Sequence, residues 1–351
     1  MDDTTVQDLK NTIEEISAKI IPQTLEEFDA IGSADDVIRM LHDFVKAHCN
    51  DLPATHHNPD SKRDTPGAET FFWTLWETAF KEMGKWELEG HESSPHVIKA
   101  IAFVNALRAQ PKGKSIWTIW GEDVDITSCP LLGPSIREAN NGPFYYTGPD
   151  DSETSRPDVQ NALAGAGSGD STKECVLLAL RRRREWLALQ AFIARLVSDV
   201  GDNSYLRHGI WAARDGLEDW PLEPPVITSE PATEDPLDRE DTAAYRALMV
   251  EGAAIWLCLA APQLYSCAEI WGPNGNPDWK ANQGAPGRGG ARWKGVDGMD
   301  PEKQRWKLWK EVLLEVVTWY DKEASEGRVK GWRVKEVAVK ALKAMDAAEQ
   351  Q

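Results

Sequence analysis

Three short segments of the sequence each bring several carboxylates within reach of one another. They are EDVD at 122–125, RDGLED at 214–219 and EDPLD at 234–238. Carboxylates this close raise one another's pKa, which suits general acid or base catalysis, and they can also hold a cation jointly. We predict that the catalytic acids are Glu218, Glu234, Asp235 and Asp238. A plain ion pair on a helix surface is the simpler interpretation of Arg214 and Glu218, which lie four residues apart.

Tryptophan and arginine accompany these acids. The chain has 16 tryptophans, and three pairs of them are spaced three residues apart, at 73/76, 117/120 and 306/309. On a helix this spacing places both indoles on one face, where they fill a core or line a pocket for a flat or cationic ligand. Core packing is the simpler interpretation of most of them. The predicted substrate-binding residues are Arg182, Trp211, Arg214, Asp215 and Trp256.

No cofactor and no metal site is predicted. His48, Cys49, His56 and His57 are of metal-ligand types, but this segment lacks the second ordered pair that a zinc site needs. The sequence also has no Gly-rich phosphate loop, no GxSxG nucleophile elbow and no HExxH helix. The common motif-bearing enzyme classes are therefore unsupported.

Four consecutive arginines, residues 181–184, lie in a predicted helix. Successive helical residues turn by about 100°, so four neighbours cannot all face one partner. Arg182 falls on the apolar stripe that includes Leu178 and Trp186. We expect it to be partly desolvated and to need a carboxylate or carbonyl partner. The alternative is that Arg182 extends to solvent at an irregularity of the helix.

Charge is distributed unevenly along the chain. The formal net charge is −18, yet residues 280–343 contain 15 Lys and Arg against 9 Asp and Glu. A basic C-terminal third on an acidic body is suited to RNA or another acidic partner, whereas solvated helix faces are the simpler interpretation. The predicted RNA-binding residues are Arg181, Arg183, Arg184, Lys307 and Lys310.

Helical periodicity dominates the elements that must position these residues. Apolar residues recur every three or four positions through most of the chain, and no strand-like alternation is evident. We therefore predict an all-α fold, an irregular bundle of about nine or ten helices with long polar inserts. The predicted domains are an N-terminal helical unit over 1–48 and a main helical domain over 68–348, with inserts at about 141–171, 220–237 and 271–299. The later helices are expected at 173–199, 203–218, 238–264, from Asp300 onward and at 334–348.

Targeting and redox features favour the cytoplasm. No run of about 18 apolar residues is present, and residues 1–20 are acidic and amphipathic, unlike a secretory signal. The five cysteines are scattered and form no CxxC motif, so we expect reduced thiols. We therefore expect a cytoplasmic protein without a membrane partner.

Four segments carry a family resemblance. EWLALQAFIARL, YLRHGIWAARDGLE, AAIWLCLAAPQLY and RWKLWKEVLLEVV resemble the signature helices of a tryptophan-rich fungal family of unknown function, over roughly residues 70–345. More loosely, the chain resembles the fungal arginine-containing cyclodipeptide synthases, which join amino acids delivered by aminoacyl-tRNA. The Asp-Asp-x-x-Glu motif associated with those synthases is absent, and Glu234-Asp235-Pro236-Leu237-Asp238 is its nearest counterpart.

The looser resemblance implies three kinds of group: carboxylates and indoles that hold a guanidinium, a base that frees an α-amine, and a basic surface for tRNA phosphates. Our first functional hypothesis is therefore an enzyme of fungal secondary metabolism, an aminoacyl-tRNA-dependent cyclodipeptide synthase that uses arginine. Its partners would be aminoacyl-tRNA and an amino-acid or other small-molecule substrate. The second hypothesis is a non-catalytic helical binding or scaffold protein that docks an acidic partner through its basic C-terminal third.

Overall fold

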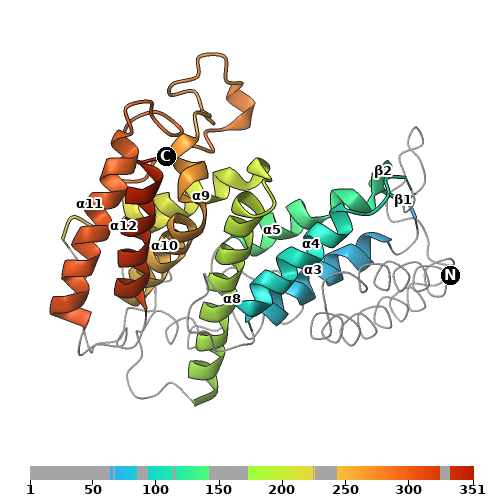
Figure 1. Cartoon of the computed structure of the whole chain (residues 1–351), viewed down its shortest axis with the longest axis horizontal. Coiled ribbons are helices and arrows are strands. Elements are labelled where there is room, and N and C mark those ends of the chain that lie inside the picture. Colours follow the sequence, from blue (N-terminus) through green and yellow to red (C-terminus); the bar gives the residue numbers. More distant parts are fainter. Residues whose placement is uncertain are drawn as a thin grey trace. The chain divides into compact units, whose positions relative to one another are not determined.

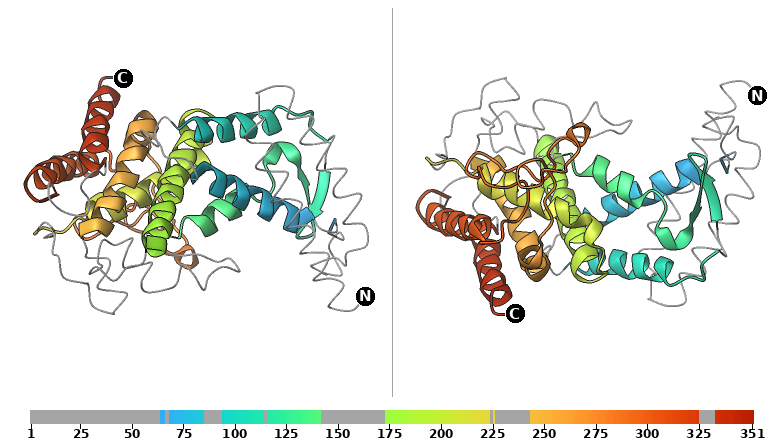
Figure 2. Two further views of the ribbon diagram at one scale, coloured as in Figure 1. Left: turned by 90° about the horizontal axis from the view of Figure 1, so that it is seen from below. Right: turned by 90° about the horizontal axis from the view of Figure 1, so that it is seen from above.

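The computed structural model describes two compact units of the chain. The described residues are 64–65, 68–84, 94–113, 116–141, 173–223, 225, 243–324 and 333–351, and Figures 1 and 2 draw them as coloured ribbons. Unit 1 contains the described residues up to Asn141 except Ser94. Unit 2 contains Ser94 and the described residues from Lys173 onward. The predicted domain over 68–348 therefore contains parts of two units. The predicted N-terminal helical unit over 1–48 lies outside the described residues.

The described part of unit 1 contains three α-helices and a β-hairpin (Figure 1). Its elements are α3 (Ala68–Gly84), α4 (Pro95–Arg108), β1 (Ile116–Ile119), β2 (Glu122–Asp125), the 3-10 helix η2 (Ile126–Ser128) and α5 (Leu132–Ala139). Helix α3 packs against α4, α5 and β1. The buried Trp76 of α3 donates from Nε1 to the carbonyl of Pro130 at 2.7 Å. This indole therefore joins α3 to the segment that precedes α5.

The β-hairpin is a feature that the sequence analysis missed. Strands β1 and β2 pair antiparallel, with Ile119 opposite Glu122. Trp120 and Gly121 form the two-residue turn, and both have positive φ, 57° and 78°, as the type I′ turn of a tight hairpin requires. The prediction that Trp117 and Trp120 share a helix face is wrong, because one lies in a strand and the other in a turn. Strands of four residues are too short for their alternation to stand out.

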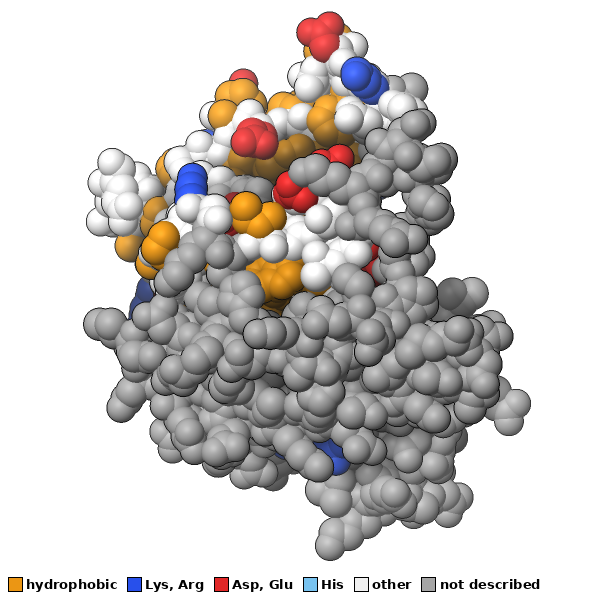
Figure 3. All heavy atoms as spheres, turned by 90° about the vertical axis from the view of Figure 1, so that its right-hand side faces the viewer, with side chains coloured by type: hydrophobic (Ala, Val, Ile, Leu, Met, Phe, Trp, Pro, Cys, Tyr) orange, Lys and Arg blue, Asp and Glu red, His pale blue; other side chains and the backbone are white. Residues whose placement is uncertain are grey.

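The hairpin leaves hydrophobic side chains at the surface. Ile116 is 50% and Trp120 46% exposed, whereas Trp117 is buried. Trp120 donates from Nε1 to Glu69 of α3 at 2.9 Å, so its edge is fixed although its ring is not covered. On the side of the molecule that Figure 3 shows, hydrophobic side chains lie among acidic and basic ones in the described part of the surface.

The described part of unit 2 is a bundle of helices around α10 (Figure 2). Its elements are α8 (Lys173–Ser198), η3 (Asn203–Tyr205), α9 (Leu206–Ala213), η4 (Arg214–Glu218), α10 (Ala243–Ser266), η6 (Ala281–Gln283), α11 (Gln304–Trp319), η7 (Tyr320–Ala324) and α12 (Val334–Ala348). The segments η3 and η6 are 3-10 turns, and η4 and η7 are π-helical turns. Helix α10 packs against α8, α9, η4 and α12, and α12 packs against α11.

Helix α10 is the core of unit 2. Ile255, Trp256 and Leu257, three successive residues, are each at most 1% exposed, so the helix is buried all round at this level. The helix bends at Ala260, because Pro262 lacks the N–H of a regular helical bond and its ring crowds the preceding turn. By length and composition α10 could span a membrane, but 78% of its apolar window is buried inside the fold.

The predicted all-α class is confirmed, with eight α-helices among the described residues. Two predicted boundaries differ from the structure. The helix expected over 203–218 consists of a 3-10 turn, an α-helix and a π-helical turn in succession. The helix expected from Asp300 begins at Gln304, because Lys303 has a positive φ of 57° and closes a turn. The carboxylate of Asp300 then accepts the N–H groups of Gln304 and Arg305.

Candidate functional site

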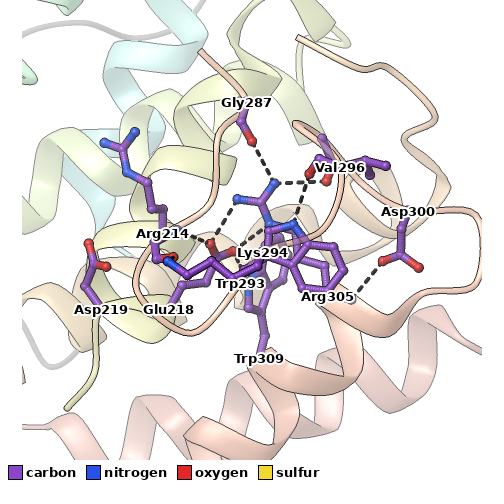
Figure 4. Close-up of polar contacts among 12 residues, drawn as sticks. Arg214, Glu218, Asp219, Gly287, Trp293, Lys294, Val296, Asp300, Arg305 and Trp309 are labelled. Atoms are coloured by element: carbon purple, nitrogen blue, oxygen red, sulfur yellow. Dashed lines mark hydrogen bonds and ion pairs between the residues drawn. The ribbon is translucent and has the colours of Figure 1, made fainter. Parts of the chain in front are cut away.

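Helix α9 and the turn η4 carry four of the predicted site residues. Trp211 lies in α9, and Arg214, Asp215 and Glu218 lie in η4. The N–H of Asp219 donates to the carbonyl of Arg214, five residues earlier, at 2.9 Å. Such π-helical turns are uncommon and occur often at functional sites. Figure 4 shows that Glu218 points toward the interior while Arg214 of the same turn points away from it.

The carboxylate of Glu218 is completely buried and accepts four hydrogen bonds (Figure 4). Arg305 of α11 forms a two-pronged ion pair with it, with Nε 2.6 Å from Oε1 and Nη2 3.1 Å from Oε2. The Nε1 of Trp309 donates to Oε1 at 2.8 Å, and the N–H of Gly290 donates to Oε2 at 2.8 Å. Each carboxylate oxygen therefore has two donors from within unit 2.

The guanidinium of Arg305 is satisfied in the same way. Its Nη1 donates to the carbonyls of Gly287 and Gly298, both at 2.9 Å. Its central carbon lies 5.8 Å from the ring centroids of Trp293 and of Trp309, where the electron-rich ring faces attract a cation. We use the name buried cluster for Glu218, Trp293, Arg305 and Trp309.

The buried cluster corrects the predicted role of Glu218. A side chain with no exposed surface does not contact a substrate, so this geometry does not support Glu218 as a catalytic acid. The sequence analysis also missed Arg305. A signal for it exists, because Arg305 falls on the buried stripe of α11 that continues through Trp309, Val312 and Val316. A cation on such a stripe requires a buried acceptor.

The predicted insert at 271–299, between α10 and α11, contributes Trp293 to the buried cluster. Its first and last residues, Trp271 and Met299, are buried. The N–H of Trp271 donates to the carbonyl of Asp297 at 2.7 Å, and the N–H of Gly287 donates to the carbonyl of Trp271 at 2.8 Å. A side chain at Gly287 would overlap the carbonyl of Asp297. The glycines that resemble a surface loop in the sequence permit close backbone packing here.

The same segment is fastened to α9 and η4. The Nε1 of Trp211 donates to the carbonyl of Pro286 at 2.6 Å. The N–H of Ala291 donates to the carboxylate of Asp219 at 2.6 Å, next to the bond from Gly290 to the buried cluster. These anchors fix the path of residues 286–291 along the helix that carries the predicted site.

The outer face of η4 holds a second ion pair. The Nε of Arg214 lies 2.7 Å from Oδ1 of Asp215, and both side chains are partly exposed. Partial burial raises the pKa of Asp215, Arg214 opposes that effect, and the carboxylates of Asp219 and Glu218 add to it. A raised pKa moves a carboxyl group toward the range in which it exchanges protons at neutral pH. Asp215 is therefore an acid or base candidate on this face.

His208 precedes this pair on α9 and is buried. Its ring centroid lies 4.8 Å from that of Trp211 in an edge-on contact. Burial lowers the pKa of His208 to about 4, and the positive charge of Arg207 contributes. The imidazole is therefore neutral at pH 7.

Two other predicted substrate-binding residues have partners inside unit 2. Trp256 is completely buried and donates from Nε1 to Oε1 of Gln190 at 2.9 Å, so it is a core residue and is not accessible to a substrate. Arg182 lies 2.7 Å from Glu185 and is 17% exposed. This matches the carboxylate partner expected for a partly desolvated guanidinium on an apolar stripe.

The predicted RNA-binding cations differ in their surroundings. Arg183 forms an ion pair with the buried Glu251. Lys310 lies 2.6 Å from Asp346 and 2.9 Å from Glu349, and these hydrogen bonds raise the pKa of Lys310. The remaining three are the exposed Arg181 and Lys307 and the part-buried Arg184. Contact of any of them with RNA stays a prediction.

The other catalytic candidates, Glu234, Asp235 and Asp238, lie outside the described residues. So does the segment with the metal-ligand types at 48–57. Within the part of the chain that the structure describes, no three His, Cys, Asp or Glu side chains are grouped so as to hold a metal ion.

Fold and site together define a mostly helical protein whose second unit contains a buried glutamate–arginine pair. The chain belongs to the family described as "Protein of unknown function (DUF3632)", which matches residues 73–313. The resemblance to a family of unknown function is thus confirmed, while the match carries no information on fungal origin or on cyclic dipeptides. No curated protein and no solved structure matches the chain.

Proposed function

We propose that this protein is a helical binding protein that docks a polyanionic partner on its basic loop, residues 279–296. The observation that carries the proposal is the charge of that loop. It contains Lys280, Arg288, Arg292 and Lys294 and no acidic residue, although the formal net charge of the chain is −18. Salt limits the reach of distant surface acids to about 8–10 Å, so a local basic segment attracts a polyanion even on an acidic protein.

Ion pairing distinguishes the basic loop from the later part of the basic C-terminal third. Five cations of α11, α12 and the residue before α12 lie within 3.0 Å of a carboxylate. They are Arg305, Lys310, Arg333, Lys335 and Lys340. In the loop, Arg292 is paired in this way with Glu315, at 2.8 Å. Lys280, Arg288 and Lys294 are exposed. The loop therefore supports docking better than the helices that the sequence analysis favoured.

The basic loop is also ordered by the rest of unit 2. The bonds of Gly290 and Ala291 to the carboxylates of Glu218 and Asp219 hold it on η4. A surface that is ordered before binding loses less conformational entropy when the partner arrives. This arrangement supports recognition by the basic loop. In this proposal the buried cluster holds the loop in the conformation that binds the partner.

The proposal is tested by titrating the full chain with inorganic polyphosphate, a polyanion without bases, in isothermal titration calorimetry at several salt concentrations. We expect binding that weakens with salt. The double variant Arg288→Ala/Lys294→Ala should bind more weakly and with a smaller salt dependence. The matched control Lys335→Ala/Lys340→Ala removes the same charge from carboxylate-paired lysines and should bind nearly as the unaltered chain does. No binding, or equal losses in both variants, would contradict the proposal.

A second proposal keeps the enzyme hypothesis, aminoacyl-tRNA-dependent synthesis of a cyclic dipeptide that contains arginine. The observation that favours it is Asp215, whose pKa is raised on a partly exposed face beside Arg214. Incubation of the full chain with arginyl-tRNA and other aminoacyl-tRNAs, followed by mass spectrometry, should yield a cyclic dipeptide that Asp215→Asn abolishes. The absence of product with every arginyl-tRNA mixture would end this second proposal.

A further inference from the structure

We infer that the polyanion is a single-stranded nucleic acid, whose phosphates contact the basic loop and whose bases stack on Trp279 and Trp211. The inference rests on the proposed function, because it names the partner of the same loop. It comes from the placement of indoles beside the loop cations. Charge alone fits an acidic peptide equally well, whereas a cation next to an accessible flat ring fits a phosphate next to a base.

Trp279 is the first residue of the basic loop and is followed by Lys280. Its indole Nε1 donates to the carbonyl of Gly284 at 2.7 Å, and its backbone N–H donates to the carbonyl of Asn276 at 3.1 Å. The ring is partly exposed. Because the hydrogen bond of the indole lies in the ring plane, it orients the ring without using the faces on which a base would stack.

Trp211 is a second partly exposed indole beside the loop. Its Nε1 donates to the carbonyl of Pro286, two residues before Arg288, at 2.6 Å. The guanidinium carbon of Arg207 lies 5.9 Å from the centroid of the same ring. A cation of α9 thus accompanies this indole, which is hydrogen-bonded to the loop two residues before Arg288. Guanidinium groups bind phosphate through paired N–H bonds and also stack on flat rings.

Trp293 lies in the same loop, but its ring contacts the buried Arg305. Its ring faces Arg305, and its Nε1 donates to the carbonyl of Val296 at 3.0 Å. Side chains at Gly289 or Gly295 would overlap this ring, so the two glycines make room for it within the loop. Trp293 therefore differs from Trp211 and Trp279 in that its ring faces the buried Arg305.

Stacking on the indoles selects single strands. In a duplex each base already stacks on its neighbours and its faces are not accessible, whereas an unpaired base can lie on an aromatic side chain. The inference therefore predicts a preference for single strands over a duplex. It does not require a particular sequence, because every base has a flat face.

The test is fluorescence anisotropy of the full chain with a labelled oligouridine. The competitors are an abasic oligonucleotide of equal length, a duplex of equal length and polyglutamate. We expect the oligouridine to bind most tightly. Trp279→Ala should weaken its binding by about 5- to 150-fold, the loss expected for one stacked base. Trp279→Phe keeps a ring on which a base can stack, so it should retain most of the affinity for oligouridine. Trp279→Ala should bind polyphosphate as tightly as the unaltered chain does, which would show that the basic loop is intact.

Charge and stacking are separated by a second variant. Arg288→Ala/Lys294→Ala should weaken binding of oligouridine and of polyphosphate alike. It should reduce the slope of log affinity against log salt for oligouridine by about 1.4, the amount expected for two phosphate contacts on a single strand.

Three results would overturn the inference while the proposed function stands. The first is that the abasic strand, the duplex or polyglutamate binds as tightly as oligouridine. The second is that Trp279→Ala leaves the affinity for oligouridine unchanged, and the third is that Trp279→Ala lowers the affinities for oligouridine and polyphosphate equally. In the last case the indole would support the loop and not the bases. Failure of the unaltered chain to bind polyphosphate at all would overturn the proposed function and this inference together.

Discussion

One π-helical turn, η4, contributes to two ion pairs that differ in their surroundings. Glu218 and Arg305 are far apart in sequence, completely buried and bonded on every side. Arg214 and Asp215 are neighbours in sequence and partly exposed. Breaking a buried pair leaves an uncompensated charge in the interior, whereas an exposed pair contributes little to stability. The motif RDGLED thus contains one buried acid that holds the fold and an ion pair that is partly exposed to solvent.

Breaking the buried pair should have the largest effect. We expect Arg305→Ala and Glu218→Ala each to lower the free energy of unfolding by about 3–5 kcal/mol, because the remaining partner stays buried without its counter-ion. Urea denaturation followed by circular dichroism measures the change. The paired replacement Glu218→Leu/Arg305→Met should be less destabilising than either single variant, since it leaves no unpaired charge. A loss below about 1 kcal/mol in both single variants would contradict this assignment.

His208 of α9, the helix that precedes η4, adds a pH dependence to the stability of the fold. Its pKa is about 4 in the folded protein, below the ordinary value of about 6.5, so the unfolded chain takes up a proton more readily. Stability from this group is complete above pH 6.5 and is lost as pH falls from about 6.5 to 4, by about 3 kcal/mol in total. Urea denaturation at a series of pH values should give a flatter profile for His208→Gln. If the free energy of unfolding changed equally with pH in the two proteins, the attribution of this pH dependence to His208 would be wrong.

The cap of α11 should have a smaller effect. The carboxylate of Asp300 accepts the N–H groups of Gln304 and Arg305, at 2.8 Å each. Asp300→Ala should lower the free energy of unfolding by about 1 kcal/mol, as loss of a helix cap does, and Asp300→Asn by less. Thermal unfolding of the three proteins measures the difference. A loss as large as that in Arg305→Ala would mean that the cap also positions the buried pair.

The exposed pair should have the smallest effect on stability. We expect Arg214→Ala and Asp215→Ala to change the free energy of unfolding by less than about 1 kcal/mol, with a coupling that diminishes in high salt. A double-mutant cycle in urea measures that coupling. A value near that of the buried pair would remove the distinction between the two sides of η4.

The helices were predictable because their apolar spacing is local information. The expected helices at 173–199 and 334–348 correspond to α8 (Lys173–Ser198) and α12 (Val334–Ala348) within a residue. Trp211, Arg214 and Asp215 could be grouped for the same reason, since they lie on one stretch of helix. Their separation from Glu218 was not predictable, because periodicity does not indicate where a helix widens into a π-helical turn.

Long-range partners and close backbone contacts were not predictable. The acid that pairs with Arg305 is 87 residues away, and no local pattern selects it among the other carboxylates. The glycines of 271–299 are equally consistent with a surface insert or with packed backbone, and burial alone distinguishes the two cases.

The extra residue of the π-helical turn determines the direction in which the side chains after it point. Removing one residue between Ala213 and Asp219 would rotate the downstream side chains by about 100°, so Glu218 would leave Arg305 and Asp219 would leave the N–H of Ala291. The bonds of Gly290 to Glu218 and of Ala291 to Asp219, which hold the basic loop on η4, would be lost together. A change in helical phase at this turn would therefore alter the interior and the basic loop together.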